Sequence, residues 1–315
     1  MAVILVSGAG GFVGSYALPA LVDVGHRVVA LVRTERSGKK TLRRLSPAQR
    51  DRVEIRIADV TRPETLSAAF VDVDAVLHLV AIPRDDDGGR SLTAVNTHGT
   101  RNMLWAAEQA GARRFVHQGA MGVVDDPRLH YASSKARAEA LVSKSGLDWT
   151  ILKPSLLFGP GDGFFNIVAD LVRASPGIVP ITGRGRTRFQ PLAIEDLARI
   201  IVMVFADHGT IGRAFELGGP RYWTYREIVE EVVRAMDRRR LLLPLPIPLV
   251  KLVARSLELA HLPFPVATDQ LRQLAFDNIG PLDGVRESFG FTPRSMSGAL
   301  GYLRRPKRDQ EMRPA

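Results

Sequence analysis

The sequence predicts an α/β protein in which a doubly wound parallel sheet is followed by a smaller, mostly helical C-terminal domain. Three observations lead to this prediction. Short runs of β-branched residues alternate with amphipathic stretches through the first half of the chain. A glycine-rich loop lies between the first of these runs and the first helical stretch. From about residue 159 onward, glycines and prolines interrupt the alternation, which indicates a second domain.

Six apolar runs are expected to form the strands of the sheet. Val, Ile and Leu fill them without strict alternation, as in parallel strands that are buried on both faces. The runs span residues 3–6, 27–32, 53–57, 75–79, 114–117 and 150–152. The stretches at 12–24 and 91–110 have the spacing of amphipathic helices, and they supply the connections of βαβ units.

The second half of the chain predicts helices at residues 194–205 and 224–236. Thr224, with Glu227 three residues later, has the signature of a capping box. Residues 241–259 begin with an apolar run that prolines interrupt, and we expect them to end in a helix. The predicted domains are the doubly wound domain at 1–158 with a returning segment near 189–217, a cap or substrate domain at 159–303, and a basic tail at 304–315.

Composition excludes several classes of protein. A hydrophobic content of 45% excludes a disordered chain and a polytopic membrane protein. The absence of cysteine excludes disulfides, thiolate metal sites and a cysteine nucleophile. No targeting segment is recognised at the N-terminus, so we expect a cytoplasmic protein. The net charge of +10 is weak evidence for nucleic-acid binding, and no nucleic-acid partner is expected.

A phosphate-binding loop is predicted directly after the first strand. The strict G-x-G-x-x-G pattern fails because its last position is Val13, whereas Gly8, Gly11 and Gly14 fit G-x-x-G-x-x-G. Gly8 would permit a tight turn, Gly11 a close approach of backbone N–H groups to a pyrophosphate, and Gly14 close packing of the helix on the sheet. The helix N-terminus at Phe12 and Val13 would supply N–H donors and a partial positive charge. The loop therefore predicts a dinucleotide-binding Rossmann fold.

The end of the second strand favours NADP as the cofactor. An NAD site carries a carboxylate there for the ribose 2'-hydroxyl, but this sequence has Val32 followed by Arg33. Residues 33–56 hold nine basic and three acidic side chains, a surplus of six that would attract the extra phosphate of NADP. A solvated basic helix face also accounts for many of these charges. Glu35 can reach a ribose hydroxyl, and it leaves NAD open as the alternative.

Tyr131 and Lys135 are the candidates for catalysis. Their spacing puts both side chains on one face of a helix. A nearby ammonium and the positive nicotinamide would lower the pKa of the phenol, which could then give a proton to a carbonyl oxygen or take one from an alcohol. The same spacing also occurs by chance, so the pair alone does not establish catalysis.

Together, the motifs resemble those of the short-chain dehydrogenase/reductase superfamily in its extended or atypical form. The resemblance rests on the glycine loop, Tyr-x-x-x-Lys, and four further segments, at residues 58–60, 96–102, 153–155 and 158–162. Within the superfamily, residues 189–198 and 216–227 are most similar to the branch that contains the nucleotide-binding accessory subunit of complex I and its bacterial relatives.

The resemblance implies several roles around the cofactor. Asn96 would support the backbone of the active site. The implied cofactor contacts are Asp59 and Val60 beside the adenine, Val80 and Ala81 along the ribose, Lys135 on the nicotinamide ribose, and Pro154 beside the carboxamide. From the sequence alone, Asp59 is equally consistent with a helix N-cap or a turn residue.

One departure from the family pattern concerns the substrate oxygen. The family usually has a Ser at the end of the fifth strand to bond this oxygen, and here Gly119 occupies that place. Gln118 or a backbone N–H could act as the donor instead. Cofactor binding is therefore expected, and catalysis is the open question.

Two functions follow as hypotheses. The first is an NADP-dependent reductase or dehydrogenase that acts on a small carbonyl or alcohol. The second is a catalytically silent NADPH-binding structural or redox-sensing partner, which would dock through residues 241–259 and the basic tail onto a protein complex or a membrane face.

No metal site is expected, because the seven histidines lack ligand spacing. A loop with Arg184, Arg186 and Arg188 is either solvated or an anion clamp. Substrate identity and oligomeric state stay open.

Overall fold

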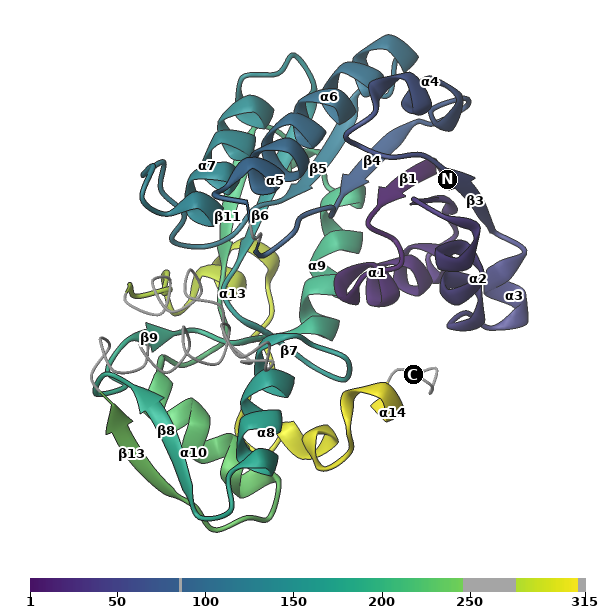
Figure 1. The fold of residues 1–315 in the computed structure, drawn as a ribbon. Helices are drawn as coiled ribbons and strands as arrows, with labels where there is room; N and C mark the ends of the chain where they lie inside the picture. Colours follow the sequence, from purple (N-terminus) through teal and green to yellow (C-terminus); the bar gives the residue numbers. More distant parts are fainter. Residues whose placement is uncertain (85–86, 246–275, 311–315) are drawn as a thin grey trace. The chain divides into compact units, whose positions relative to one another are not determined.

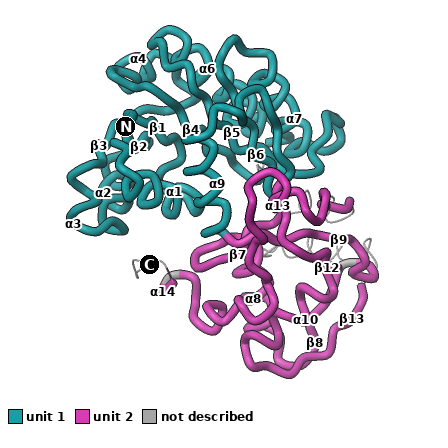
Figure 2. Tube along the Cα trace, turned by 180° about the vertical axis from the view of Figure 1, so that it is seen from behind, with its two compact units in different colours: residues 1–154, 194–216, 313–315 teal, residues 155–193, 217–312 magenta. Residues whose placement is uncertain are grey.

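The structure is a computed structural model, and it describes residues 1–84, 87–245 and 276–310. The chain forms two compact units, which Figure 2 shows in teal and magenta. Unit 1 contains Met1–Pro154 and Ile194–Glu216, and unit 2 contains Ser155–Ala193 and Leu217–Met312. The chain therefore leaves unit 1 after Pro154, returns for one helix and one strand, and leaves it again.

Unit 1 is built on a seven-stranded sheet in the order β11-β6-β5-β4-β1-β2-β3 (Figure 1). The strands are β1 (Val3–Ser7), β2 (Arg27–Val32), β3 (Val53–Ile57), β4 (Ala75–His78), β5 (Arg114–Gln118), β6 (Asp148–Pro154) and β11 (Arg213–Leu217). All neighbours from β3 through β6 pair in parallel. This arrangement confirms the predicted doubly wound sheet. The sequence analysis missed β11, because Arg213 and Glu216 interrupt the apolar run that a buried strand would show.

Helices cover both faces of this sheet. Figure 1 shows α1 (Phe12–Asp23) beside α9 (Ile194–Ala206), and α6 (Gly99–Ala110) beside α7 (His130–Ser143). The other helical segments are α2 (Glu35–Arg43), α3 (Pro47–Arg50), η1 (Pro63–Thr65), α4 (Leu66–Ala69), α5 (Arg90–Leu92), the π-helix η2 (Thr93–His98) and η3 (His208–Thr210). The single helix expected at 91–110 is thus three consecutive segments.

One part of the core of unit 1 lies between the sheet and α6. Leu5, Val76 and Phe115 from the strands are fully buried against Met103 and Ala107 of α6. Burial of such side chains stabilises the fold by about 1.5–3 kcal/mol each. The packing holds the carboxyl ends of the parallel strands in one fixed row.

Unit 2 combines helices with short strand pairs. Its helical segments are α8 (Phe164–Ala174), α10 (Tyr225–Ala235), α13 (Gly284–Phe289), η4 (Leu300–Arg304) and α14 (Lys307–Gln310). Its strand pairs are β8 (Ile178–Thr182) with β13 (Leu241–Leu245), β9 (Arg188–Phe189) with β12 (Trp223–Thr224), and β7 (Leu157–Phe158) with β10 (Leu192–Ala193). The sequence analysis did not predict these pairs, since two of them have only two residues per strand.

Two predictions for unit 2 have a direct outcome. The capping box is confirmed, because Thr224 accepts a hydrogen bond from the Glu227 N–H and the Glu227 carboxylate accepts one from the Thr224 N–H. The apolar start of the segment at 241–259 forms the strand β13, which the sequence analysis did not predict. Residues 246–259, including the helix expected there, lie outside the described residues, as do residues 311–315 of the tail.

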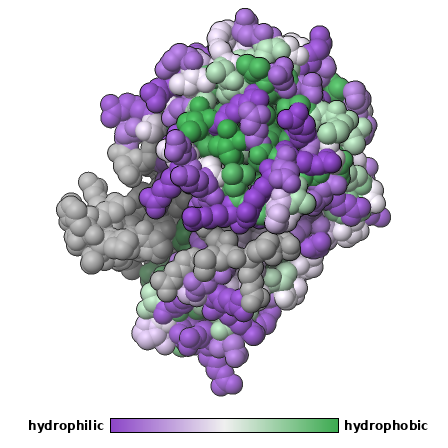
Figure 3. Space-filling model, turned by 90° about the vertical axis from the view of Figure 1, so that its right-hand side faces the viewer, coloured by the Kyte–Doolittle hydropathy of each residue, from purple (hydrophilic) through white to green (hydrophobic). Residues whose placement is uncertain are grey.

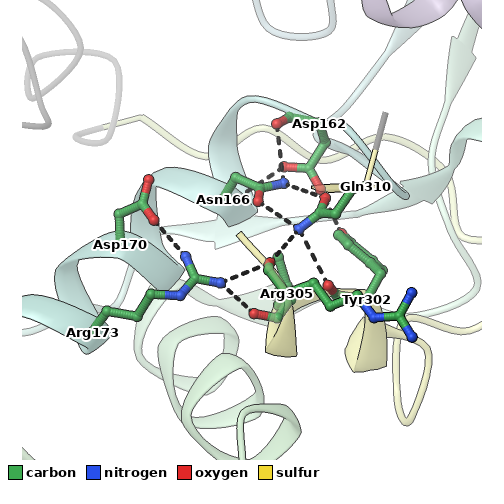
Figure 4. Close-up of polar contacts among 8 residues, drawn as sticks. Asp162, Asn166, Asp170, Arg173, Tyr302, Arg305 and Gln310 are labelled. Carbon is green, nitrogen blue, oxygen red and sulfur yellow. Dashed lines mark hydrogen bonds and ion pairs between the residues drawn. The ribbon is translucent and has the colours of Figure 1, made fainter. Parts of the chain in front are cut away.

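A buried polar cluster joins the C-terminal segment to α8 (Figure 4). The Asp162 carboxylate accepts from the N–H groups of Phe165 and Asn166 and, at 2.5 Å, from the Tyr302 hydroxyl. Gln310 of α14 donates to the Asn166 side chain at 2.9 Å and accepts from the Gly161 N–H at 3.0 Å. These bonds satisfy the N-terminus of α8 and fix the position of α14.

One face of the protein is shown in Figure 3. Hydrophilic side chains predominate there, and an apolar area in the upper half is bordered by polar residues. Among the described residues, no helix combines the length and the apolar composition that a membrane span requires.

Candidate dinucleotide and catalytic site

The glycine loop lies at the point where the strand order reverses. β2 and β3 follow on one side of β1, and β4, β5 and β6 follow on the other. Gly8 directly follows β1, with a φ of +72° that favours glycine. A Cβ at Gly8 would lie 3.1 Å from the backbone of Leu79 and Val80, which follow β4. In open α/β sheets this switch point, at the carboxyl ends of the strands, is where ligands bind.

The first helix presents a free N-terminus at the same place. Gly11 is the N-cap of α1, and no side chain caps the helix or places a negative charge in its first turn. The Gly11 N–H donates to the Gly8 carbonyl at 2.9 Å, which closes the loop. The N–H groups of Phe12, Val13 and Gly14 have no acceptor within the helix, because a helix leaves its first N–H groups unpaired. The loop and helix therefore fit a pyrophosphate.

The structure gives a different reason for glycine at residue 14 than the sequence analysis did. A Cβ at Gly14 would lie 2.5 Å from the Ala9 carbonyl oxygen and 2.6 Å from that of Gly8. The glycine is thus required by the loop that precedes the helix, and not by packing of the helix on the sheet. Any side chain here would push the phosphate loop away from the helix N-terminus.

The expected adenine end is formed by residues after β2 and β3. Asp59 lies in a turn, where its carboxylate accepts from the N–H and the hydroxyl of Thr61 at 2.9 and 2.7 Å. Burial raises the pKa of Asp59, but the Thr61 bonds and the charges of Arg33 and Arg62 outweigh it, so the pKa is lowered. Arg33 is exposed and lies near this carboxylate. The Val60 side chain is buried in the core of unit 1, and its carbonyl accepts a hydrogen bond from the Asn102 side chain at 2.8 Å.

Asn96 joins the segment after β4 to α7. Its side chain exchanges two hydrogen bonds with the backbone of Ile82, at 2.9 and 3.1 Å. It also donates to the Ser134 hydroxyl at 3.0 Å, and Ser134 donates to the Tyr131 carbonyl. Asn96 lies in the π-helix, a feature that often marks functional sites. In the segment after β4, Val80 and Ala81 precede Ile82. Val80 is partly buried and Ala81 is exposed.

Tyr131 and Lys135 lie one turn apart on α7, as expected. The Lys135 ammonium donates to the Gln118 carbonyl at 2.6 Å, at the end of β5. Burial lowers the pKa of Lys135 to about 8. Burial, and then the charge of Glu139, raise the pKa of Tyr131 to about 12. In the protein alone the phenol is therefore neutral at pH 7, and its pKa lies above the usual value rather than below it.

The end of β5 carries no hydroxyl. The Gly119 N–H donates to the Leu152 carbonyl at 2.8 Å, and the glycine is buried. A side chain added at Gly119 would meet the carboxylate of Glu139 on α7. Among the described residues, the Gln118 side-chain oxygen is buried without a hydrogen-bond partner. Pro154 is buried at the end of β6, where its carbonyl accepts from the Met121 N–H at 3.0 Å.

Sequence reasoning missed two buried histidines beneath this site. His78, at the end of β4, bonds the Ser7 hydroxyl at 2.7 Å and the Thr100 hydroxyl at 3.0 Å, so it links β1 to α6. Burial lowers its pKa to about 3, and it stacks on His117, whose pKa burial also lowers. Both imidazoles are therefore neutral. Their place in short apolar strands gave no signal beyond that of a core residue.

Two other features involve none of the residues assigned to the cofactor or to catalysis. Arg188 of the arginine loop forms an ion pair with Asp277 within unit 2. A pocket of about 420 Å³ opens beside the start of α7. Its lining residues, none of which is a predicted site residue, are Gly88, Gly89, Arg90, Thr93, Ala94, His98, Pro127, His130, Ser133 and Arg137.

The match to a family agrees with this geometry. The model of a family described as NAD(P)H-binding matches residues 8–170, a range that starts at the first loop glycine and includes Tyr131 and Lys135. The chain belongs to this family. Membership of an NAD(P)H-binding family agrees with the resemblance to the extended or atypical short-chain dehydrogenase/reductase superfamily that the motifs indicated.

Named relatives of this NAD(P)H-binding protein differ in role. It is 27% identical over 276 residues to NADH dehydrogenase (ubiquinone) 1 alpha subcomplex subunit 9, mitochondrial, of Arabidopsis thaliana, a match that covers 85% of this chain and 67% of that protein. It is 26% identical over 329 residues to a 3 beta-hydroxysteroid dehydrogenase/Delta 5-->4-isomerase of Mycobacterium tuberculosis, covering 92% of this chain and 86% of that protein.

A solved structure shares the fold over nearly the full length. It is a dTDP-glucose 4,6-dehydratase of Streptomyces venezuelae with NAD bound, with a TM-score of 0.71, 21% identity, and coverage of 98% of this chain and 97% of that chain. At this identity the likeness concerns the fold alone.

Proposed function

We propose that this protein is an NADPH-linked oxidoreductase that reduces a small carbonyl compound or oxidises the corresponding alcohol. The observation that carries the proposal is the placement of Tyr131 and Lys135 in the same unit as the switch-point loop. The loop has no side chain that would exclude a pyrophosphate, and α7 presents a proton donor with a cation one turn away.

The residues proposed for the cofactor come from five strand ends and α7. Catalysis is assigned to Tyr131 and Lys135. Cofactor binding is assigned to Gly8, Gly11, Phe12, Val13, Gly14, Arg33, Asp59, Val60, Val80, Ala81, Lys135 and Pro154. Residues 159–303 are proposed as the substrate domain.

The chemistry of the chain's own residues supports reduction. When bound, the reduced dinucleotide supplies the hydride that goes to the carbonyl carbon. The Tyr131 phenol, which is neutral at pH 7, gives its proton to the carbonyl oxygen. The Lys135 ammonium stabilises the phenolate that remains, and its pKa of about 8 keeps it mostly charged at pH 7. The phenolate regains its proton from solvent.

NADP is proposed over NAD because of Arg33. Its exposed guanidinium follows β2 and has the charge that a 2'-phosphate needs. Glu35, in the first turn of α2, is also exposed and supports the NAD alternative.

A catalytically silent NADPH-binding partner is the second candidate. Two observations favour it: no hydroxyl lies at Gly119, and one relative is named as a subunit of a multi-subunit NADH dehydrogenase. We propose that this silent partner would dock to a protein complex or a membrane face. A cytoplasmic location is also proposed. Of the proposed docking segment at 241–259, residues 246–259 lie outside the described residues.

The Tyr131→Phe variant separates the two candidates. We expect it to lose about 10²–10⁴-fold of the carbonyl-dependent oxidation of NADPH, because it removes the general acid. NADPH affinity, followed by the fluorescence of the bound cofactor, should stay within about twofold, since the phenyl ring keeps the shape. If none of the carbonyl compounds in a broad panel supports the oxidation of NADPH by the wild-type protein, the silent partner is the better account.

A further inference from the structure

Glu139 continues the face of α7 that carries the proposed catalytic pair. It lies four residues after Lys135 and eight after Tyr131, so the three side chains follow one another on successive turns. The Glu139 side chain is only 13% exposed. A carboxylate this deeply placed needs partners that offset the loss of water.

Two partners hold the Glu139 carboxylate. One oxygen accepts from the Ala120 N–H at 3.0 Å, and the other lies 3.3 Å from the ammonium of Lys153 on β6. Glu139 thereby connects three elements: α7, the chain that leaves β5, and β6 beside Pro154. Charge-assisted bonds of this kind are about twice as strong as neutral ones.

The absent side chain at residue 119 is explained by the same carboxylate. A Cβ at Gly119 would meet a carboxylate oxygen of Glu139, with the carboxyl carbon 2.9 Å away and Ile151 at 3.1 Å. A serine at this position would displace Glu139 from the Ala120 N–H and from Lys153. Gly119 and Glu139 are therefore a matched pair, and the glycine is not simply a lost serine.

The charge of Glu139 acts on both members of the pair. It raises the pKa of Tyr131 in the same direction as burial, and it raises the pKa of Lys135 against burial. His78 and His117, which pack beneath, are neutral and add no opposing charge. Lys153 is the cation on the far side of the carboxylate. The combined effect favours a neutral phenol beside a charged amine.

We propose that Glu139 is a positioning residue of this site, which holds the chain after β5 in place and keeps Tyr131 and Lys135 in the protonation states that donate a proton to a carbonyl. The site is thereby biased toward carbonyl reduction. This bias rests on the proposed function, whereas the effect of Glu139 on the two titrations does not.

The test is a titration of Lys135 and Tyr131 by NMR, in protein labelled with ¹³C at lysine Cε and tyrosine Cζ. Glu139→Gln keeps the size and a hydrogen-bond acceptor but removes the charge. We expect the midpoints of both residues to move to lower pH. Glu108→Gln, which removes the same charge from an exposed position on α6, should leave both unchanged. Lys135→Met and Tyr131→Phe assign the signals. If Glu139→Gln leaves both midpoints in place, the proposal is wrong.

A second set of variants tests the matched pair by stability. Gly119→Ser alone should lower the melting temperature, and Gly119→Ser combined with Glu139→Ala should recover part of the loss, since the space is then free. If the losses of Gly119→Ser and Glu139→Ala simply add, the two residues do not share that space and the positioning role fails. Neither readout needs turnover, so a protein that reduces no carbonyl would overturn the proposed function while leaving the role of Glu139 measurable.

Discussion

Burial shifts the pKa values of Tyr131 and Lys135 in opposite directions, and both shifts favour the neutral form of the side chain. It raises the pKa of the phenol to about 12 and lowers the pKa of the amine to about 8. A phenol that remains neutral suits a proton donor, while an amine with this pKa is still mostly charged at pH 7. Phenolate chemistry, as in alcohol oxidation, would need a further positive charge at the site, such as that of an oxidised nicotinamide.

Arg33 carries the prediction on cofactor selectivity. If it contacts the 2'-phosphate, Arg33→Ala should weaken NADPH binding by about 10-fold or more, since a hydrogen bond to a charged group contributes about 1.5–3 kcal/mol. NADH binding should change little. Calorimetric titration with both cofactors gives this comparison, and Arg36→Ala, at an exposed position on the neighbouring helix, is the control. Equal weakening of both cofactors would argue against a 2'-phosphate contact.

At the residue scale, the sequence predicted the short motifs, but it did not predict which side chains contact residues that are distant in the sequence. The spacing of Tyr131 and Lys135 and the glycine pattern are local, so the sequence contains them whole. Glu139 was not predicted, because its role depends on Ala120 and Lys153, which folding brings to it. The raised pKa of Tyr131 was likewise missed, since burial of a given side chain is a property of the packed structure.

The loop and α1 form one element whose geometry depends on Gly14. Gly→Ala inside a helix ordinarily stabilises by about 1 kcal/mol. At Gly14 we expect a net loss of about 1–3 kcal/mol, because the added methyl group meets two carbonyl oxygens of the loop. NADPH binding should fall as well. Chemical denaturation and a binding titration measure the two effects.

Gly146→Ala is the matched control for Gly14→Ala. Nothing lies within 4 Å of a Cβ at Gly146, in the turn that precedes β6, and its φ is not in the left-handed region. It should leave both stability and NADPH affinity unchanged. A Gly14→Ala variant that binds NADPH as well as the wild type would contradict the assigned role of the loop.

Most long elements were predicted, and the exceptions have physical reasons. Buried parallel strands such as β2 and β4 are continuous apolar runs, which the sequence displays directly. β11 is short and includes Arg213 and Glu216, so it could not be distinguished from a loop. The π-helix inside the expected helix at 91–110 was not predicted, because the spacing of apolar residues did not distinguish it from an α-helix.

At the scale of the whole molecule, the polar cluster in unit 2 makes stability depend on pH. Burial raises the pKa of Asp162 to about 6 from an unperturbed 3.8, although hydrogen bonds from Tyr302 and the α8 backbone oppose this shift. Between these pH values the folded protein holds a proton that the unfolded chain has released. The free energy of unfolding should therefore fall as pH rises from about 4 to about 6.

Asp162→Asn should remove this contribution to the slope. Denaturant unfolding at a series of pH values between about 4 and 7 measures it in the wild type and the variant. Asp170→Asn, which changes an exposed carboxylate of the same helix, is the control and should keep the wild-type slope. Identical slopes in the wild type and Asp162→Asn would show that the cluster does not titrate as described.

The fold and the family were predictable from the sequence because their signals are distributed over most of the chain. The βαβ rhythm, the glycine loop and the Tyr-x-x-x-Lys motif all point to the same architecture, and the family match over residues 8–170 agrees with them. Activity and cofactor selectivity depend instead on a few side chains, among them Arg33, Gly119 and Glu139. Their chemistry is decided by neighbours that the sequence does not list together.

Transfer of deuterium tests the central claim, that Tyr131 and Lys135 serve a reductase, most directly. The protein is incubated with NADPH deuterated at C4 of the nicotinamide and with a panel of small carbonyl compounds, and the alcohols are analysed by mass spectrometry. We predict an alcohol with deuterium on its carbinol carbon from the wild type, formed about 10²–10⁴-fold more slowly by Tyr131→Phe although that variant binds NADPH. Tight NADPH binding by the wild type without any deuterated alcohol would contradict the account.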